Sequence, residues 1–81
     1  MDSGLKEKIE RWKATAEIFV KNNTKAFIKE VSGDIYFCEI LLVGEDSLRI
    51  LCFAPERRAG YKYTIYWPLV IALEEYKEVS E

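Results

Sequence analysis

The sequence has no histidine, and it has only two cysteines and two prolines in 81 residues. Without histidine, the usual general base and the Ser-His and Cys-His nucleophile pairs are missing. The two cysteines, Cys38 and Cys52, do not make a disulfide framework, and a zinc site is not expected. We therefore predict that the protein is not an enzyme, with no catalytic residues, no metal and no cofactor.

Excess positive charge and long apolar runs are also missing. The formal net charge is −2, so no overall basic field attracts nucleic acid, and RNA contact would need a local patch. The longest apolar runs, Ile40–Val43 and Tyr66–Leu73, are too short to span a bilayer. Residues 1–20 mix charges and do not resemble a signal peptide. We expect a cytoplasmic protein without a membrane partner.

Apolar residues, in contrast, are abundant. They make up 49% of the chain, and aromatic residues make up 14%. A chain of this length fits one small domain over residues 1–81, whose core is too small to hide so much apolar surface. We expect part of that surface to be buried against other copies of the chain.

Residues 3–20 are predicted to form an amphipathic helix. Its apolar residues step by three or four and share one stripe: Leu5, Ile9, Trp12, Ala16 and Phe19. Asp2 or Ser3 can cap its start, and Asn22-Asn23 can end it in the left-handed region. The stripe either packs on the domain's own core, which we favour, or binds a partner.

The period changes after the helix to that of strands. Residues 25–31, 35–43 and 48–54 are three predicted strands, joined by turns at 32–34 and 44–47, which predicts an antiparallel meander. A turn centred on Glu45 places Cys38 opposite Cys52, Ile40 opposite Ile50 and Leu42 opposite Leu48 on one apolar face. The same register pairs Glu39 with Leu51, Leu41 with Arg49 and Phe37 with Phe53. It brings the two thiols close together, and we expect them to be reduced core residues.

Pro68 interrupts the best strand pattern, residues 61–76. Proline is excluded from the interior of a central strand, so we predict two strands that meet at a corner of one or two residues, Trp67-Pro68. The fold is then mainly β: an N-terminal helix, then a five-stranded, strongly bent antiparallel small barrel over residues 25–76, with a tail at 77–81.

This order of elements resembles the Sm-like family. "KAFIKEVSGDIYFCEILL" (25–42) is similar to its first motif, with Gly33 at the turn glycine, Tyr36 at an often aromatic position and Ile40 at an apolar position. "TIYWPLVIALEE" (64–75) is similar to its second motif. There, apolar positions are matched by Ile65, Val70, Ile71 and Leu73.

The chain departs from the family's uridine-binding residues. Gly44 and Leu48 stand where the resemblance implies Asp and Asn, and Tyr66-Trp67 replaces Arg-Gly. Cys38 stands where a small residue is usual. The resemblance implies a divergent Sm-like member that binds single-stranded RNA through other groups. The candidates are the corner aromatics, the basic loop and the second turn: Tyr66, Trp67, Arg57, Arg58, Lys62, Asp46 and Ser47.

The resemblance also implies assembly. In the family, the fourth strand of one subunit extends the sheet of the next through its fifth strand, so we expect a homo-oligomeric ring of five to eight subunits. Its expected interface residues are Tyr63, Ile65, Leu69 and Ile71.

Two other functions stay open. The first is an oligomeric scaffold or protein-interaction module that binds no nucleic acid, which the negative charge favours. The second is an SH3- or Tudor-like barrel with an aromatic cage for a cation. Its candidate residues are Tyr36, Tyr61, Tyr63, Tyr66 and Trp67.

Overall fold

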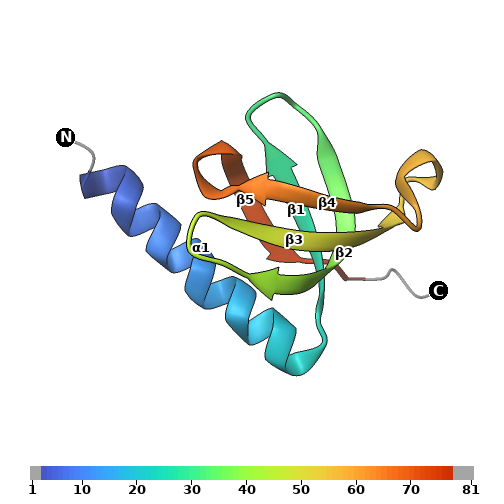
Figure 1. The fold of residues 1–81 in the computed structure, drawn as a ribbon, viewed down its shortest axis with the longest axis horizontal. Helices are drawn as coiled ribbons and strands as arrows, with labels where there is room; N and C mark the ends of the chain where they lie inside the picture. Colours follow the sequence, from blue (N-terminus) through green and yellow to red (C-terminus); the bar gives the residue numbers. More distant parts are fainter. Residues whose placement is uncertain (1–2, 78–81) are drawn as a thin grey trace.

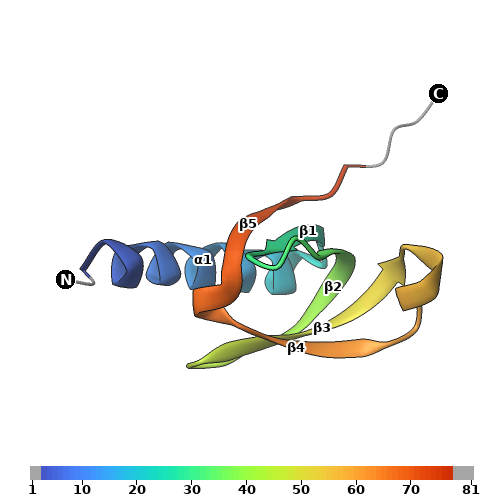
Figure 2. The same ribbon diagram turned by 90° about the horizontal axis from the view of Figure 1, so that it is seen from above.

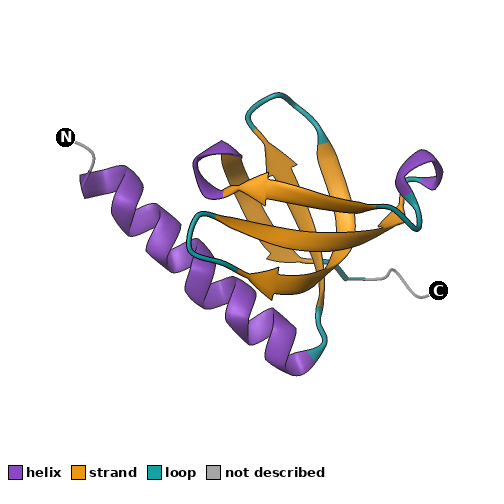
Figure 3. Ribbon diagram, in the orientation of Figure 1, coloured by secondary structure: helices purple, strands orange, loops and turns teal. Residues whose placement is uncertain are grey.

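The computed structural model describes residues 3–77, which form one helix followed by five strands (Figures 1 and 3). The elements are α1 (Ser3–Asn22), β1 (Lys25–Glu30), β2 (Ile35–Val43), β3 (Ser47–Ala54), β4 (Lys62–Tyr66) and β5 (Val70–Glu75). Two single turns of 3-10 helix, η1 (Glu56–Arg58) and η2 (Trp67–Leu69), lie on either side of β4. The mainly β class and the order of elements are confirmed. The predicted cap at Asp2 and most of the predicted tail lie outside the described residues.

α1 uses its apolar stripe to cover the core, as predicted. It packs against β2, η2 and β5. Ala16 is completely buried, and Ile9, Trp12 and Phe19 pack against the core. Leu5 is 46% exposed because the first turns of α1 extend beyond the sheet (Figure 1).

The helix ends at Asn22-Asn23, as predicted from the sequence. Asn23 has φ 55°, in the left-handed region that asparagine tolerates. This bend lets the Thr24 N–H donate to the Phe19 carbonyl at 2.8 Å. The carbonyl would otherwise lack a partner at the helix end. α1 is two residues longer than expected because the bend follows Asn22.

The five strands form one antiparallel sheet in the order β4-β3-β2-β1-β5. The sheet is strongly curved, and β3 and β4 curve away from β1 and β5 in Figure 2. Within residues 3–77, β4 and β5 do not pair with each other and are the two edges of the sheet. The sheet is therefore open, and the predicted barrel is not confirmed.

One face of every strand supplies the core. Alternate residues of β1, β2 and β3 are buried, as a period of two requires. Trp67 and residues of β4 and β5 complete it. The buried apolar residues of the strands and η2 are Ala26, Ile28, Tyr36, Cys38, Ile40, Leu48, Ile50, Cys52, Ile65, Trp67, Val70 and Leu73.

The register between β2 and β3 is partly as predicted. Cys38 faces Cys52, Ile40 faces Ile50, and Glu39 faces Leu51. The other three predicted pairs are wrong, because the register shifts on both sides of this central part. Phe37 faces Ala54, Leu42 faces Arg49, and Val43 faces Leu48.

A β-bulge at Leu41 causes one of these shifts. The Gly44 N–H donates to the Ser47 carbonyl at 2.8 Å, so the turn has Glu45 and Asp46 at its centre. A turn with two central residues cannot continue a register centred on one residue, and Leu41 is the extra residue that resolves the mismatch. Leu42 is consequently 58% exposed, and Leu48 stays buried.

Pro68 lies in the corner between β4 and β5, which spans the three residues of η2. The first turn of a helix needs no N–H donor at this position, so Pro68 breaks no ladder bond. Trp67 fixes the corner. It is 1% exposed, its backbone N–H donates to the Asp46 carbonyl at 3.1 Å, and its indole Nε1–H donates to the Gly44 carbonyl at 3.0 Å.

This geometry predicts the effect of Trp67→Phe. The change leaves the Gly44 carbonyl without the indole donor and shrinks a buried side chain. We expect the free energy of unfolding, measured by urea denaturation, to fall by about 1–3 kcal/mol. Tyr66→Phe, at the exposed neighbouring position, is the control and should change stability by less than about 0.5 kcal/mol. Equal effects of the two changes would contradict this role of Trp67.

Candidate functional site

The free edge of β4 has a defined pattern of backbone groups. At the start of β4, the Cys52 N–H donates to the Tyr61 carbonyl, and at its end the Trp67 N–H donates to the Asp46 carbonyl. Antiparallel pairs alternate between bonded and unbonded positions, so between these points Tyr63 and Ile65 bond to β3. The backbone groups of the three alternate residues point away from the sheet: Lys62, Thr64 and Tyr66.

The free edge of β5 has a matching pattern. The Tyr76 N–H donates to the Lys25 carbonyl at 2.9 Å, so Glu74 and Ala72 bond to β1 by the same alternation. The backbone groups of Leu73 and Glu75 therefore point outward. Ile71 is the extra residue of a bulge and has no partner position on β1. The alternation thus leaves three residues of β4 and two residues of β5 able to bond to another strand.

Exposed apolar side chains lie along these edges. Tyr66 is 55% exposed on β4, and Ile71 is 44% exposed on β5. Leu69 in η2 is 39% exposed. Of the predicted interface residues, Leu69 and Ile71 are thus at the surface, Tyr63 is half-buried, and Ile65 belongs to the core.

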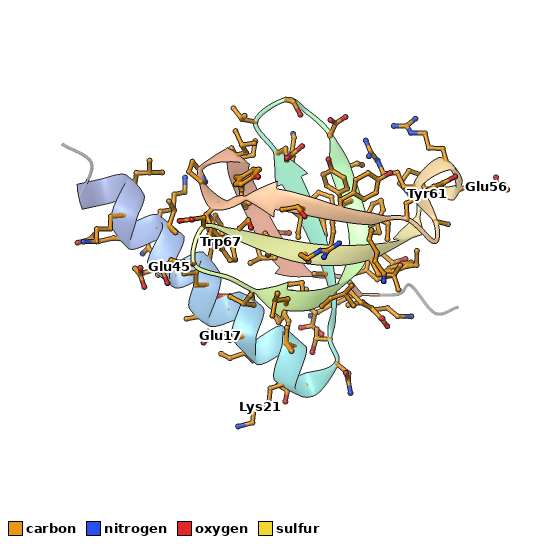
Figure 4. All side chains as sticks on the ribbon, in the orientation of Figure 1. Glu17, Lys21, Glu45, Glu56, Tyr61 and Trp67 are labelled. Carbon is orange, nitrogen blue, oxygen red and sulfur yellow. The ribbon has the colours of Figure 1, made fainter. Side chains whose placement is uncertain are left out.

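The predicted RNA-binding residues fall into two groups at opposite ends of β4. Figure 4 shows this separation: the labelled residues Tyr61 and Trp67 lie at opposite ends of β4. Five residues of strand span about 13 Å. At the η2 end, Tyr66 and Asp46 line a hollow of about 240 Å³ with Ile9, Glu45 and Pro68. Two carboxylates beside Tyr66 disfavour a phosphate there.

The other two residues of this group lie inside the fold. Trp67 also lines the hollow but is buried, so neither ring face is open to a base. Ser47 is half-buried and pairs with Tyr66 across β3 and β4. A Cβ at position 44 would lie 3.0 Å from the Ser47 carbonyl oxygen, which explains glycine where the family resemblance implies Asp. The same turn accepts the indole N–H of Trp67 at the Gly44 carbonyl and its backbone N–H at the Asp46 carbonyl.

The basic group lies at the η1 end of β4, and only part of it is free. Arg57 and Lys62 are exposed. The Arg58 side chain is 13% exposed and pairs with Asp34 at 3.3 Å. Its guanidinium also lies over the ring of Tyr36, at 4.5 Å, and near that of Tyr63, at 5.3 Å. Arg58 thus joins η1 to the β1–β2 turn instead of facing solvent.

The five aromatic residues of the predicted cage do not form one cage. The Tyr36 and Tyr63 rings are 5.4 Å apart, and the cation that they contact is the chain's own Arg58. Tyr61 is 62% exposed, near the start of β4, and Tyr66 and Trp67 lie at its other end. A cage for an external cation would require Arg58 to leave.

An aromatic cluster on the outer face of the sheet was not predicted from the sequence. The Phe27 and Phe37 rings are 5.4 Å apart, and Tyr76 contacts both Phe37 and Phe53. The Lys25 ammonium lies 5.0 Å from the centre of the Phe53 ring. One signal in the sequence could have predicted the cluster: each of the three phenylalanines lies next to a core residue of its strand, and therefore on the opposite face of the sheet. The cluster holds the segment after β5 against the sheet.

The described part of the chain offers little for other kinds of site. In residues 3–77, no group of three or more Cys, Asp or Glu side chains is arranged to hold a metal ion. None of the helices in this range has the length and apolar character needed to cross a membrane.

Fold and edges together define a small, mainly β domain: within the described residues 3–77, a helix packs on an open sheet that has two unpaired edges. Comparison with known proteins adds no family: no family model matches the chain, and searches of curated proteins and of solved structures found no match.

Tyr36 gives a testable pH dependence. Burial, followed by its hydrogen bond to Glu30 at 2.9 Å and the charge of that carboxylate, raises the pKa of Tyr36 to about 12. Because the folded-state pKa is raised, its contribution to stability is complete below pH 10 and is lost as the pH rises towards 12. The loss should reach about 2–3 kcal/mol.

The measurement is urea denaturation of the wild type and Tyr36→Phe from neutral pH to about 12. The difference in unfolding free energy between the two proteins should shift in favour of Tyr36→Phe over this range. Tyr61→Phe, at an exposed tyrosine, should follow the wild type. Parallel curves for the wild type and Tyr36→Phe would contradict the assignment.

Proposed function

We propose that this chain is a divergent Sm-like protein whose copies assemble head to tail into a closed ring of five to eight subunits. The observation that carries the proposal is that β4 and β5 are the two outermost strands of one sheet, each with one free edge within residues 3–77. Joining β4 of one copy to β5 of the next uses both edges of every copy. A ring closes without leaving an edge, and it protects apolar strands that would otherwise invite aggregation.

The outward residues favour one antiparallel register between neighbouring copies. Lys62 then lies opposite Glu75, Thr64 opposite Leu73, and Tyr66 opposite Ile71. This register pairs opposite charges at one end of the contact and two exposed apolar side chains at the other. A parallel arrangement would bring Lys62 to the apolar end of β5 and lose both pairs.

The first test is the native mass of the wild type, which should be five to eight times that of one chain by light scattering. Thr64→Pro removes an N–H that points away from β3, so the subunit should still fold and become monomeric. Arg49→Ala, at the exposed position opposite Thr64 on β3, is the matched control and should leave the ring intact. A monomeric wild type would overturn the proposal.

Charge exchange tests the register. Lys62→Glu and Glu75→Lys each place two like charges opposite one another, and each should lower the fraction of assembled protein. The double variant restores an opposite pair and should recover assembly, as measured by light scattering at low salt. Rings that are insensitive to all three variants would rule out this register while leaving ring formation itself in place.

Single-stranded RNA is the second candidate function. Exposed Arg57 can contact a phosphate, and a ring would repeat this contact in every subunit. Tyr66 is exposed in the single chain and could stack a base there, but it lies opposite Ile71 in the proposed register. Lys62 is paired with Glu75 in the proposed register, which leaves Arg57 as the exposed cation of the predicted RNA-binding residues. Trp67 and Arg58 are held inside the fold and are not included.

Oligo-U and oligo-A binding, measured at two salt concentrations, tests the RNA proposal. Affinity should fall with salt and should fall further in Arg57→Ala. Lys29→Ala, on the more distant β1, should have little effect. If rings form and neither oligonucleotide binds at low salt, the RNA proposal fails and the oligomeric scaffold is the function that remains.

A further inference from the structure

Cys38 and Cys52 occupy directly opposed positions at the centre of β2 and β3. Both side chains are buried, at 0% and 2% exposure, and both thiols are free. The Cys52 N–H donates to the Tyr61 carbonyl, and the Cys52 carbonyl accepts from the Gly60 N–H. Both backbone groups of Cys52 therefore point towards the β4 side and away from Cys38.

This orientation identifies the kind of cross-strand pair. Two opposed residues that do not exchange backbone hydrogen bonds form the close type of antiparallel pair, with Cα atoms about 4.5 Å apart. Disulfides need a Cα separation of about 4.4–6.8 Å. Both side chains are also on the core face, so the sulfur atoms lie on the same side of the sheet. The backbone already has the spacing of a disulfide.

The environment of the thiols disfavours the reactive thiolate form. Burial is the main factor that raises the pKa of Cys38, and the neighbouring Cys52 adds to it. Burial also raises the pKa of Cys52, which nearby Arg58 partly opposes. Both thiols are on the core face and closed to solvent in the folded chain, so a reagent reaches them only when the fold opens locally. The Cys38 thiol is the more deeply buried of the two, and a local opening therefore exposes Cys52 first.

We propose that Cys38 and Cys52 are an oxidative modification site, at which a small-molecule disulfide closes a reversible cross-strand disulfide within one chain. The Cys52 thiolate attacks one sulfur of the reagent, forming a mixed disulfide and releasing the first reagent thiol. The Cys38 thiolate then attacks the Cys52 sulfur and releases the second. The two cysteines lose two protons and two electrons, and the reagent disulfide is reduced to two thiols.

The new bond would lock the centre of the β2–β3 hairpin. It closes a loop that contains the Leu41 bulge and the turn whose Gly44 carbonyl accepts the Trp67 indole N–H. Cross-linking restricts the unfolded chain more than the folded one. We therefore expect oxidation to raise the midpoint of thermal unfolding by about 10 °C. The disulfide would form within one chain, whether or not the chain assembles into a ring or binds RNA.

The test uses the full chain and oxidised glutathione. Intact-mass spectrometry should show the loss of two hydrogen atoms, no glutathione adduct and no cross-linked dimer. Cys38→Ala keeps the Cys52 thiol and should give a single glutathione adduct, because no second thiol is present to displace the bound glutathione. Cys52→Ala should react more slowly, since Cys38 is the more deeply buried sulfur. A wild type that accumulates adducts, dimers or unreacted thiols would overturn the proposal.

A second measurement separates native geometry from chance closure in the unfolded chain. The effective concentration of one thiol at the other follows from the equilibrium with reduced and oxidised glutathione. We expect it to be at least about tenfold higher in buffer than in denaturing urea, because the fold holds the strands at disulfide spacing. An equal or lower value in buffer would show that the native backbone resists the bond.

Discussion

The indole N–H of Trp67 donates to the Gly44 carbonyl at 3.0 Å, and the arrangement of both sheet edges depends on this bond. It ties the corner after β4 to the turn between β2 and β3. The backbone bond from Trp67 to Asp46 holds the same two segments together. With the corner fixed, the chain leaves β4 in a new direction, and β5 pairs with β1 at the far side of the sheet. In the part of the chain that the structure describes, β4 and β5 consequently remain the two unpaired edges.

The two ends of β4 are both stabilised by side chains that the sequence suggested for ligand binding. Trp67 is buried at one end. At the other, Arg58 lies over Tyr36 and Tyr63 and pairs with Asp34. Aromatic and cationic side chains are the groups expected in a nucleic-acid site, but a small domain also needs them to cover the ends of its core. Here that structural use leaves the sheet edges as the most distinctive surface.

The elements of the fold could be predicted from the sequence because their signals are local. The helical stripe, the left-handed Asn23 and the proline corner each depend on neighbouring residues. The bulge at Leu41 could not be predicted, since it follows from the number of residues at the centre of the next turn. The roles of Trp67 and Arg58 were also beyond reach. A tryptophan beside a proline and an arginine in a polar loop are equally compatible with exposure, and only tertiary contacts distinguish the two.

One alternation connects the cysteine pair to the assembly edge. In β3, core-facing residues such as Cys52 direct their backbone groups towards β4, so Cys52 and Cys38 face each other without sharing hydrogen bonds. In β4, the core-facing residues bond back to β3, so those on the outer face, such as Thr64, direct their backbone groups outward. A shift of one residue between β3 and β4 would instead direct the backbone groups of Tyr63 and Ile65 outward. The hydrogen bonds of Gly60, Tyr61 and Trp67 at the two ends of β4 prevent that shift.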